Sequence, residues 1–245
     1  MADAPARQGR GVLRLFVPGA DASGGRVRIT GAELRHLRTL RLVPGDPFVV
    51  FDEAGTEHEV RLERVAGREA TAAIVATSRP AREPAVTLVL AAALLKGAKM
   101  DLVVEKATEL GVARIAPVLT RRALGAAHVE RWRRIAVAAA KQSGRTRIPS
   151  VDAPVAVAEL VRAPWPGVRA VLWEEEREAR FADLPAAATD AVVVVGPEGG
   201  LAADEIADAR AHGFASIGIA PRILRAETAA IVAVALALAR WGDVG

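Results

Sequence analysis

The chain has 245 residues and a mass of 25.7 kDa, enough for one large domain or for a medium domain with a small one. Hydrophobic residues make up 51% and charged residues 25%, which excludes disordered, collagenous and low-complexity classes. The absence of cysteine excludes disulfides, thiolate metal sites, iron–sulfur clusters and a cysteine nucleophile. Its 4 histidines show no two-histidine helical spacing, so no metal is expected.

The sequence also predicts a protein outside the membrane. Its longest apolar run, Ala229 to Ala239, has 11 residues, fewer than the roughly 18 that a bilayer span needs. The first ten residues, Met1 to Arg10, lack the apolar core of a secretory signal. We therefore expect a cytoplasmic location.

Charge is unevenly distributed along the chain. The formal net charge is +4, yet residues 81–165 alone carry 14 basic and 7 acidic side chains. Such a basic region is typical of a surface that binds a polyanion, although an ordinary fluctuation of surface charge would give the same pattern.

The first predicted unit is small and rich in β-structure. Short, partly alternating apolar segments bounded by glycine, proline or aspartate predict strands at Leu13–Val17, Phe48–Phe51, Glu57–Val65 and Glu69–Ala76. Leucines at helical spacing predict one helix, Ala32–Arg41. The proline-containing, charged segment Ser78–Pro84 is the predicted linker, which gives domains 1–77 and 78–245.

Apolar strands alternate with longer helices after the linker. The predicted strands are Val86–Leu95, Arg114–Leu119, Ala170–Trp173, Ala191–Val195 and Ser216–Ile219. The predicted helices are Met100–Leu110, Val129–Gln142, Ala203–His212 and Thr228–Trp241. This alternation predicts an α/β domain. Because the last helix is apolar all round, we expect it to be central or buried in a subunit interface.

A glycine-rich loop follows one of the buried strands. Gly196-Pro197-Glu198-Gly199-Gly200 stands between strand Ala191–Val195 and a helix, and ligands of α/β sheets bind at the carboxyl ends of strands. Glycines let a ligand approach the main chain closely. The loop matches neither a nucleotide phosphate loop nor a dinucleotide fingerprint, and it is also compatible with a plain strand-to-helix turn.

Charged residues lie between buried elements in the segment Arg222-Ile223-Leu224-Arg225-Ala226-Glu227-Thr228. Unpaired charges there would be costly, so a function or a structural ion pair must account for them. A second charged segment, Arg131 to Arg147, combines an inward apolar face with Arg131, Arg134, Lys141 and Arg145, which are available to phosphates or to solvent.

Taken together, Gly196–Gly200 and Arg222–Ala229 resemble the two signature motifs of the RsmE family, the 16S ribosomal RNA uridine-N3 methyltransferases of the SPOUT superfamily. Further blocks match that family in order, and they are Arg14–Val17, His36–Arg41, Pro44–Asp46, Lys96–Met100, Glu105–Gly111 and Gln142–Arg145. One departure is the pair Ile219-Ala220, where the family usually has Leu-Gly.

The resemblance implies a PUA-like β-barrel domain followed by a SPOUT-type domain with a trefoil knot. It also implies a homodimer through the knot helices, with 16S ribosomal RNA or the small ribosomal subunit as the partner. The implied cofactor is S-adenosyl-L-methionine, with no metal, and its loops carry over to Leu172–Glu175, Gly196–Gly200 and Ile217–Thr228. The implied cofactor-binding residues are Leu172, Gly196, Glu198, Gly199, Gly200, Ile217, Gly218, Ile219, Leu224, Ala226 and Thr228.

Roles for the charged residues follow from the same resemblance. Arg225 is expected to be catalytic, because a fixed positive charge would stabilise the uridine anion. The expected RNA-binding residues are Arg14, Arg38, Arg41, Lys96, Arg134, Gln142 and Arg145. Methylation at N3 needs no cysteine adduct, unlike methylation at C5. Ribose 2′-O-methylation and an inactive RNA-binding assembly factor remain as alternatives.

Overall fold

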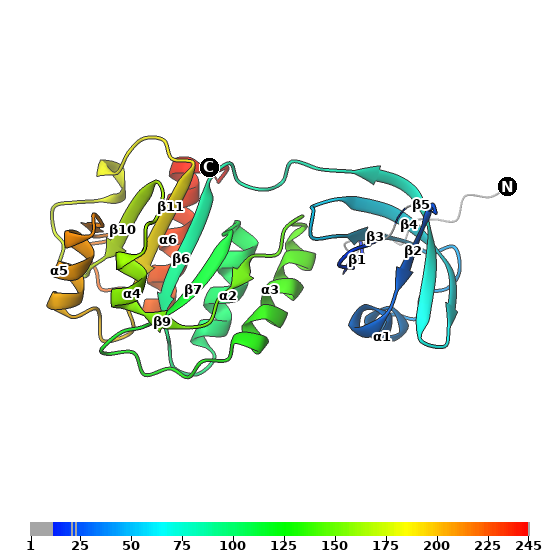
Figure 1. Ribbon diagram of the computed structural model, residues 1–245, viewed down its shortest axis with the longest axis horizontal. Coiled ribbons are helices and arrows are strands. Elements are labelled where there is room, and N and C mark those ends of the chain that lie inside the picture. Colours follow the sequence, from blue (N-terminus) through cyan, green and yellow to red (C-terminus); the bar gives the residue numbers. More distant parts are fainter. Residues whose placement is uncertain (1–11, 21, 23, 245) are drawn as a thin grey trace. The chain divides into compact units, whose positions relative to one another are not determined.

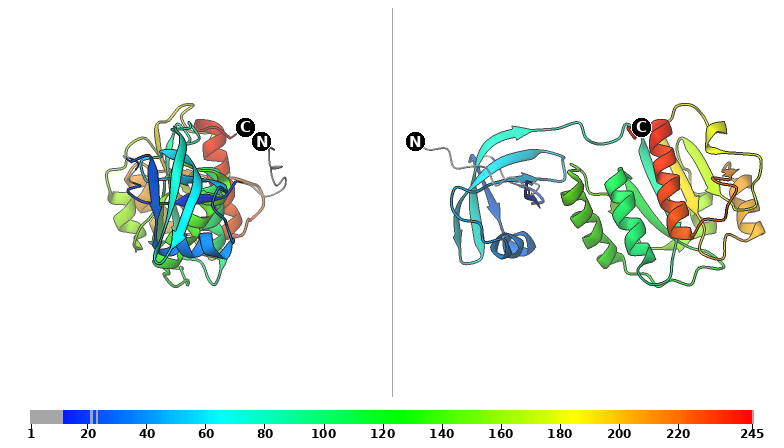
Figure 2. Two further views of the ribbon diagram at one scale, coloured as in Figure 1. Left: turned by 90° about the vertical axis from the view of Figure 1, so that its right-hand side faces the viewer. Right: turned by 180° about the vertical axis from the view of Figure 1, so that it is seen from behind.

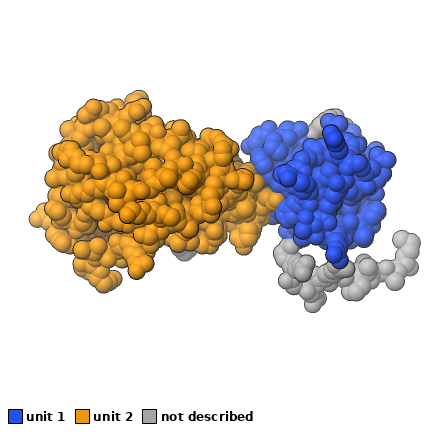
Figure 3. Space-filling view, turned by 90° about the horizontal axis from the view of Figure 1, so that it is seen from below, with its two compact units in different colours: residues 1–82 blue, residues 83–245 orange. Residues whose placement is uncertain are grey.

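The computed structural model describes residues 12–244, except 21 and 23 (Figure 1). The chain divides into two compact units, Met1–Arg82 and Glu83–Gly245 (Figure 3). This division lies beyond the predicted boundary at 77/78, because strand β5 (Glu69–Ser78) still belongs to the first unit. The segment Met1–Arg10, on which the expected lack of a secretory signal rests, lies outside the described residues.

The first unit is a five-stranded, half-barrel sheet with one helix. Its strands follow the order β1-β3-β4-β5-β2, and all neighbours are antiparallel except β1 and β3. Helix α1 (Gly31–Thr39) directs Leu34 and Leu37 into the core of this sheet. The remaining strands of the unit are β1 (Arg14–Phe16), β2 (Arg26–Ile29), β3 (Pro47–Phe51) and β4 (Glu57–Ala66).

Strand β2 was not predicted from the sequence. It has 4 residues, of which the two arginines are exposed while Val27 and Ile29 are fully buried. Two apolar residues are too few to make an alternating pattern stand out in a sequence.

The second unit is built on a seven-stranded parallel sheet. The main order is β12-β10-β11-β6-β7-β8, and β9 also pairs with β7. The predicted strands are all present, with β6 and β12 shorter than expected. The strands are β6 (Thr87–Ala93), β7 (Arg114–Leu119), β8 (Ser150–Val151), β9 (Val155–Ala156), β10 (Val168–Leu172), β11 (Asp190–Val195) and β12 (Ala215–Ile217).

Helices cover both faces of this sheet, as the apolar runs of the strands predict. Alternate residues of β6 enter different cores: Leu88 and Leu90 pack on the side of α2, α3 and α6, whereas Val89 and Ala91 pack on the side of α4 and α5. The right-hand view of Figure 2 shows the face of the sheet that α2, α3 and α6 cover. The helices are α2 (Lys99–Leu110), α3 (Val129–Ser143), α4 (Val157–Arg162), α5 (Ala203–Ala211) and α6 (Ala226–Trp241), with a 3₁₀ turn η1 (Phe181–Asp183).

Helix α6 begins at Ala226, two residues before the predicted start. One of its faces lies in the core of its own chain, where Val234 and Leu238 are at most 1% exposed. The opposite face, which includes Val232 and Ala235, is only half-buried. The helix is therefore buried in its own chain on one side and half-buried on the other, and its burial in a subunit interface stays a prediction.

Candidate active site

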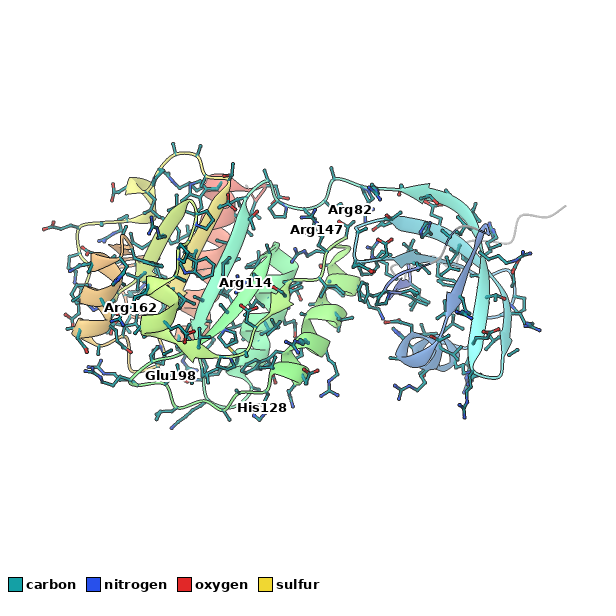
Figure 4. The ribbon with its side chains drawn as sticks, in the orientation of Figure 1. Arg82, Arg114, His128, Arg147, Arg162 and Glu198 are labelled. Carbon is teal, nitrogen blue, oxygen red and sulfur yellow. The ribbon has the colours of Figure 1, made fainter. Side chains whose placement is uncertain are left out.

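A cavity of about 480 Å³ lies where the two motif segments meet. It opens at the carboxyl ends of β10, β11 and β12, which are neighbours in the sheet. Figure 4 labels Glu198 at this edge. The cavity walls are Lys99, Leu172, Trp173, Glu174, Arg177, Val195, Gly196, Pro197, Glu198, Gly199, Gly200, Ile217, Gly218, Ile219, Ala220, Arg222, Ile223, Leu224, Arg225, Ala226 and Ala229.

The structure brings together all but one of the residues expected to bind the cofactor. Arg225, the expected catalytic residue, also lines the cavity, and it directly precedes the first residue of α6. Thr228 is the exception, because it is exposed on the first turns of α6 and does not line the cavity. Ile219 and Ala220, the departure from the family pattern, both contribute to the wall.

Glycine is required at two positions of the wall. Gly200 has a φ of 70°, which side-chain-bearing residues rarely adopt, and its amide closes a turn by donating to the Pro197 carbonyl at 2.9 Å. At Gly218, a Cβ atom would lie 2.5 Å from the Glu176 carbonyl oxygen. Gly200 is therefore required by its backbone conformation, and Gly218 by the close approach of neighbouring main chain.

Lys99 connects the two motif segments. Its ammonium nitrogen lies 2.9 Å from Glu198 Oε1 and 3.8 Å from Glu227 Oε2. Burial raises the pKa of Glu198, but hydrogen bonds from Lys99 and from backbone amides outweigh it and leave the pKa below its usual value. The hydrogen bond to Glu198 raises the pKa of Lys99, so both groups are charged at neutral pH.

Glu227 is the more deeply buried of these two carboxylates. The residue is 9% exposed, and its Oε2 atom accepts no hydrogen bond from the described residues. Its ion pair with Lys99 is therefore an electrostatic contact without a hydrogen bond, since the two atoms are 3.8 Å apart.

A polar network around Glu176 fixes the loop after β10, which forms another wall. Glu176 Oε2 accepts hydrogen bonds from the Ser216 hydroxyl at 2.8 Å and from Arg210 at 3.1 Å. Its Oε1 accepts from the amides of Glu178 and Ala179. The Ser216 hydrogen bond and these amides lower the pKa of Glu176 to about 2. The network ties the loop to strand β12.

The sequence did not indicate Arg122, which also supports the glycine loop Gly196–Gly200. Its Nη1 donates to the Gly199 carbonyl at 2.7 Å. Its stem would lie 3.4 Å from a Cβ atom placed on Gly199. The two residues are 77 positions apart. The nearest signal in the sequence was the position of Arg122 just after strand β7, at the same edge of the sheet as the glycine loop.

Two of the residues expected to bind RNA are committed to internal contacts instead. The Arg14 side chain is 9% exposed, pairs with Glu57 at 2.6 Å and lies over the ring of Phe51. Arg145 is 5% exposed, pairs with Glu83 at 2.6 Å and donates to the carbonyls of Thr108 and Val112. Their guanidinium groups are not presented to phosphates, which corrects both assignments.

The other expected RNA-binding residues lie on the surface. Lys96, Arg134 and Gln142 are exposed on the second unit, but only Lys96 lies beside the cavity, where its amide is 3.4 Å from Glu198. Arg38 and Arg41 are exposed on the first unit. These five residues are exposed, so their side chains are accessible to a polyanion.

Two further features of the described residues bear on function. They contain no cluster of three or more histidine or acidic side chains that could hold a metal ion. None of their helices combines the length and apolar character that crossing a bilayer requires.

Comparison with known proteins gives consistent matches. Residues 82–238 match the RNA methyltransferase domain family. The ribosomal RNA small subunit methyltransferase E of Synechocystis sp. is 35% identical, covering 91% of this chain and 76% of the relative. That of Mycobacterium bovis is 34% identical, covering 94% of this chain and 93% of the relative.

A solved structure also matches this chain. The ribosomal RNA small subunit methyltransferase E of Neisseria gonorrhoeae, bound to S-adenosyl methionine, superimposes with a TM-score of 0.90 at 30% identity. The alignment covers 96% of this chain and 100% of that one. The chain therefore belongs to the RNA methyltransferase family, together with the proteins known as ribosomal RNA small subunit methyltransferase E.

Proposed function

We propose that the protein is an S-adenosyl-L-methionine-dependent methyltransferase that modifies N3 of a uridine in the 16S ribosomal RNA of the small subunit. The observation that carries this proposal is the convergence of both signature segments on one cavity. A similar protein, 30% identical, was crystallised with S-adenosyl methionine.

The cavity suits such a cofactor. Its volume of about 480 Å³ is within the roughly 300 to 1,000 Å³ of small-molecule sites. Glycines 196, 199, 200 and 218 let a ligand approach the main chain closely along the wall, and both apolar and charged side chains line the remainder. The residues that would hold the cofactor are Leu172, Gly196, Glu198, Gly199, Gly200, Ile217, Gly218, Ile219, Leu224 and Ala226.

When bound, the cofactor would supply the methyl group that replaces the proton of uridine N3, with the proton passing to solvent and the sulfonium leaving as a neutral thioether. Arg225 is exposed at the cavity, so its guanidinium can approach the base. There it stabilises the negative charge of the deprotonated uridine. Glu198 is held by Lys99 and shapes the cofactor wall.

The finer points of the fold and assembly belong to the same proposal. We assign the first unit to a PUA-like domain that binds RNA and the second to a SPOUT domain with a trefoil knot. The half-buried apolar face of α6 supports a homodimer through that helix. Arg38, Arg41, Lys96, Arg134 and Gln142 are the proposed phosphate contacts, and no metal takes part. The cytoplasmic location stays a prediction from sequence.

Nucleoside mass analysis of 16S ribosomal RNA from a deletion strain tests the function. The N3-methyluridine should disappear on deletion and return with the intact gene, but not with Arg225→Ala. Loss of a 2′-O-methylated nucleotide instead would assign the chain to ribose methylation. Unchanged RNA would contradict the proposal and favour an inactive assembly factor.

A further inference from the structure

Lys99 is a residue of the cavity wall that pairs with carboxylates from two separate segments. It comes from the start of α2, whereas its two carboxylate partners come from the loop after β11 and from the first turn of α6. Glu198 and Glu227 are 29 positions apart along the chain. A single ammonium group thus bridges the two segments that carry the cavity.

We propose that Lys99 is a positioning residue that holds the glycine loop and the start of α6 in the geometry required for binding the cofactor. The inference rests on the proposed function and assigns it a further residue. Lys99 acts through Glu198 and Glu227, and its contribution is the placement of those two carboxylates.

Burial and charge give the first reason. Glu227 is 9% exposed, and among the described residues its carboxylate is paired only with Lys99. A carboxylate that loses its partner in such a place must take up a proton, bind another cation or move towards water. Each of these responses alters the first turn of α6, which directly follows Arg225.

The geometry of Glu198 gives the second reason. Glu198 Oε1 is held twice from the same segment, by the Lys99 ammonium at 2.9 Å and by the Lys96 amide at 3.4 Å. The Lys96 contact is long for a hydrogen bond, so the ammonium is the stronger restraint. Without it, the glycine loop would retain Arg122 on Gly199 but lose its anchor on α2.

Lys106 provides a matched control on the same helix. Its side chain is 37% exposed against 35% for Lys99, and it also bridges two carboxylates, Glu105 and Glu109. It does not line the cavity. Lys106 pairs within α2, whereas Lys99 pairs with two other segments, so a loss seen with Lys99→Met but not with Lys106→Met reports the bridge between segments.

The first test measures order in the cofactor-free protein, so its outcome does not depend on the activity. In Lys99→Met, amide hydrogen exchange should accelerate at residues 196–200 and 219–229 and stay unchanged in β6 and β7. Lys99→Arg should restore protection, because a guanidinium can still pair with both carboxylates. Unchanged exchange in Lys99→Met would overturn the inference, as would equal acceleration in Lys106→Met.

The second test is calorimetric titration with S-adenosylmethionine, well below the melting temperature of each variant. Lys99→Met should raise the dissociation constant about 10- to 100-fold, as expected if only about 1 to 10% of molecules keep the competent geometry. Lys99→Arg should recover most of the affinity. Glu227→Gln should weaken binding less, and the double variant Lys99→Met/Glu227→Gln should lose less than the sum of the single effects.

The two tests separate the inference from the function. If the intact protein does not bind S-adenosylmethionine, the proposed function fails, whatever exchange shows. If the intact protein binds it and Lys99→Met binds equally well, the positioning role is wrong while the function stands. A lower melting temperature in Lys99→Met with unchanged affinity would likewise overturn the positioning role.

Discussion

Arg145 Nη2 lies 2.6 Å from Glu83 Oε2, and the two residues join the start of the second unit to the end of α3. Glu83 also accepts the amides of Thr146 and Arg147 through its other oxygen. Burial raises the pKa of Glu83, but Arg145 and these amides more than offset it, so the pKa is lowered. The basic segment thus contains one arginine that serves the fold.

Replacing Arg145 should therefore affect stability before RNA binding. Arg145→Ala removes the buried ion pair with Glu83 and the side-chain hydrogen bonds to the carbonyls of Thr108 and Val112, so the free energy of unfolding should fall by about 3 to 5 kcal/mol. Arg134→Ala, on the exposed face of α3, should change it by less than about 0.5 kcal/mol. Urea denaturation measures both. Equal stability of the two variants would contradict the structural role of Arg145.

Glu176 should make stability depend on acid pH. Because its pKa in the folded protein is about 2, below the ordinary 4.5, its stabilising contribution is complete above pH 4.5. That contribution is lost as the pH falls from 4.5 towards 2. Melting curves of the intact protein and Glu176→Gln should differ most at neutral pH and converge near pH 2. Glu178→Gln, an exposed neighbour, is the control and should match the intact protein throughout.

Arg225 and Arg134 should affect different steps of the reaction. Arg225→Ala should lower the single-turnover methylation rate at saturating RNA by about 10² to 10³, because it removes one fixed charge that stabilises the transition state. Arg134→Ala should leave that rate unchanged and reduce the log–log salt slope of RNA binding by about one unit. Binding isotherms across a salt series measure the slope. If Arg225→Ala changed only the salt slope and Arg134→Ala only the methylation rate, the assigned roles would be reversed.

The two faces of α6 should respond differently to a charge. Val232→Glu, on the half-buried face, should give a folded monomer by analytical ultracentrifugation. Val234→Glu should unfold or aggregate, because Val234 is 1% exposed within its own chain. Circular dichroism separates the two outcomes. An intact protein that is already monomeric would contradict the proposed dimer.

Much of this fold could be predicted because its long elements have strong patterns. The apolar run of β11 and the glycine that ends α2 are visible in the sequence, as are the two motif segments. Strand β2 has too few apolar residues to show a period, and α4, with 6 residues, is too short for its helical spacing to stand out.

Contacts between distant residues could not be predicted in the same way. Lys99 is 99 positions from Glu198, and nothing in either segment indicates the ion pair. The sequence alone suggests that Arg14 and Arg145 are exposed. Their ion-pair partners, Glu57 and Glu83, are 43 and 62 positions away, so the sequence does not indicate these contacts. The motifs indicated which segments form the cavity. Only the fold shows which charged side chains are available to contact a ligand.

The order of strands also constrains how the second unit forms. Within the described residues, strand β10 pairs only with β11 and β12, both of which follow it in the chain, and β11 joins it to β6 through pairs such as Val192 with Val89. Pairing over about a hundred residues carries a high entropic cost of loop closure, and such topologies fold slowly. During synthesis, β6 and β7 can associate early, whereas β10 stays outside the sheet until β11 has left the ribosome. A variant that slows the docking of β11 would therefore leave the edges of β6 and β10 that pair with β11 exposed for longer. Exposed strand edges favour aggregation of the nascent chain.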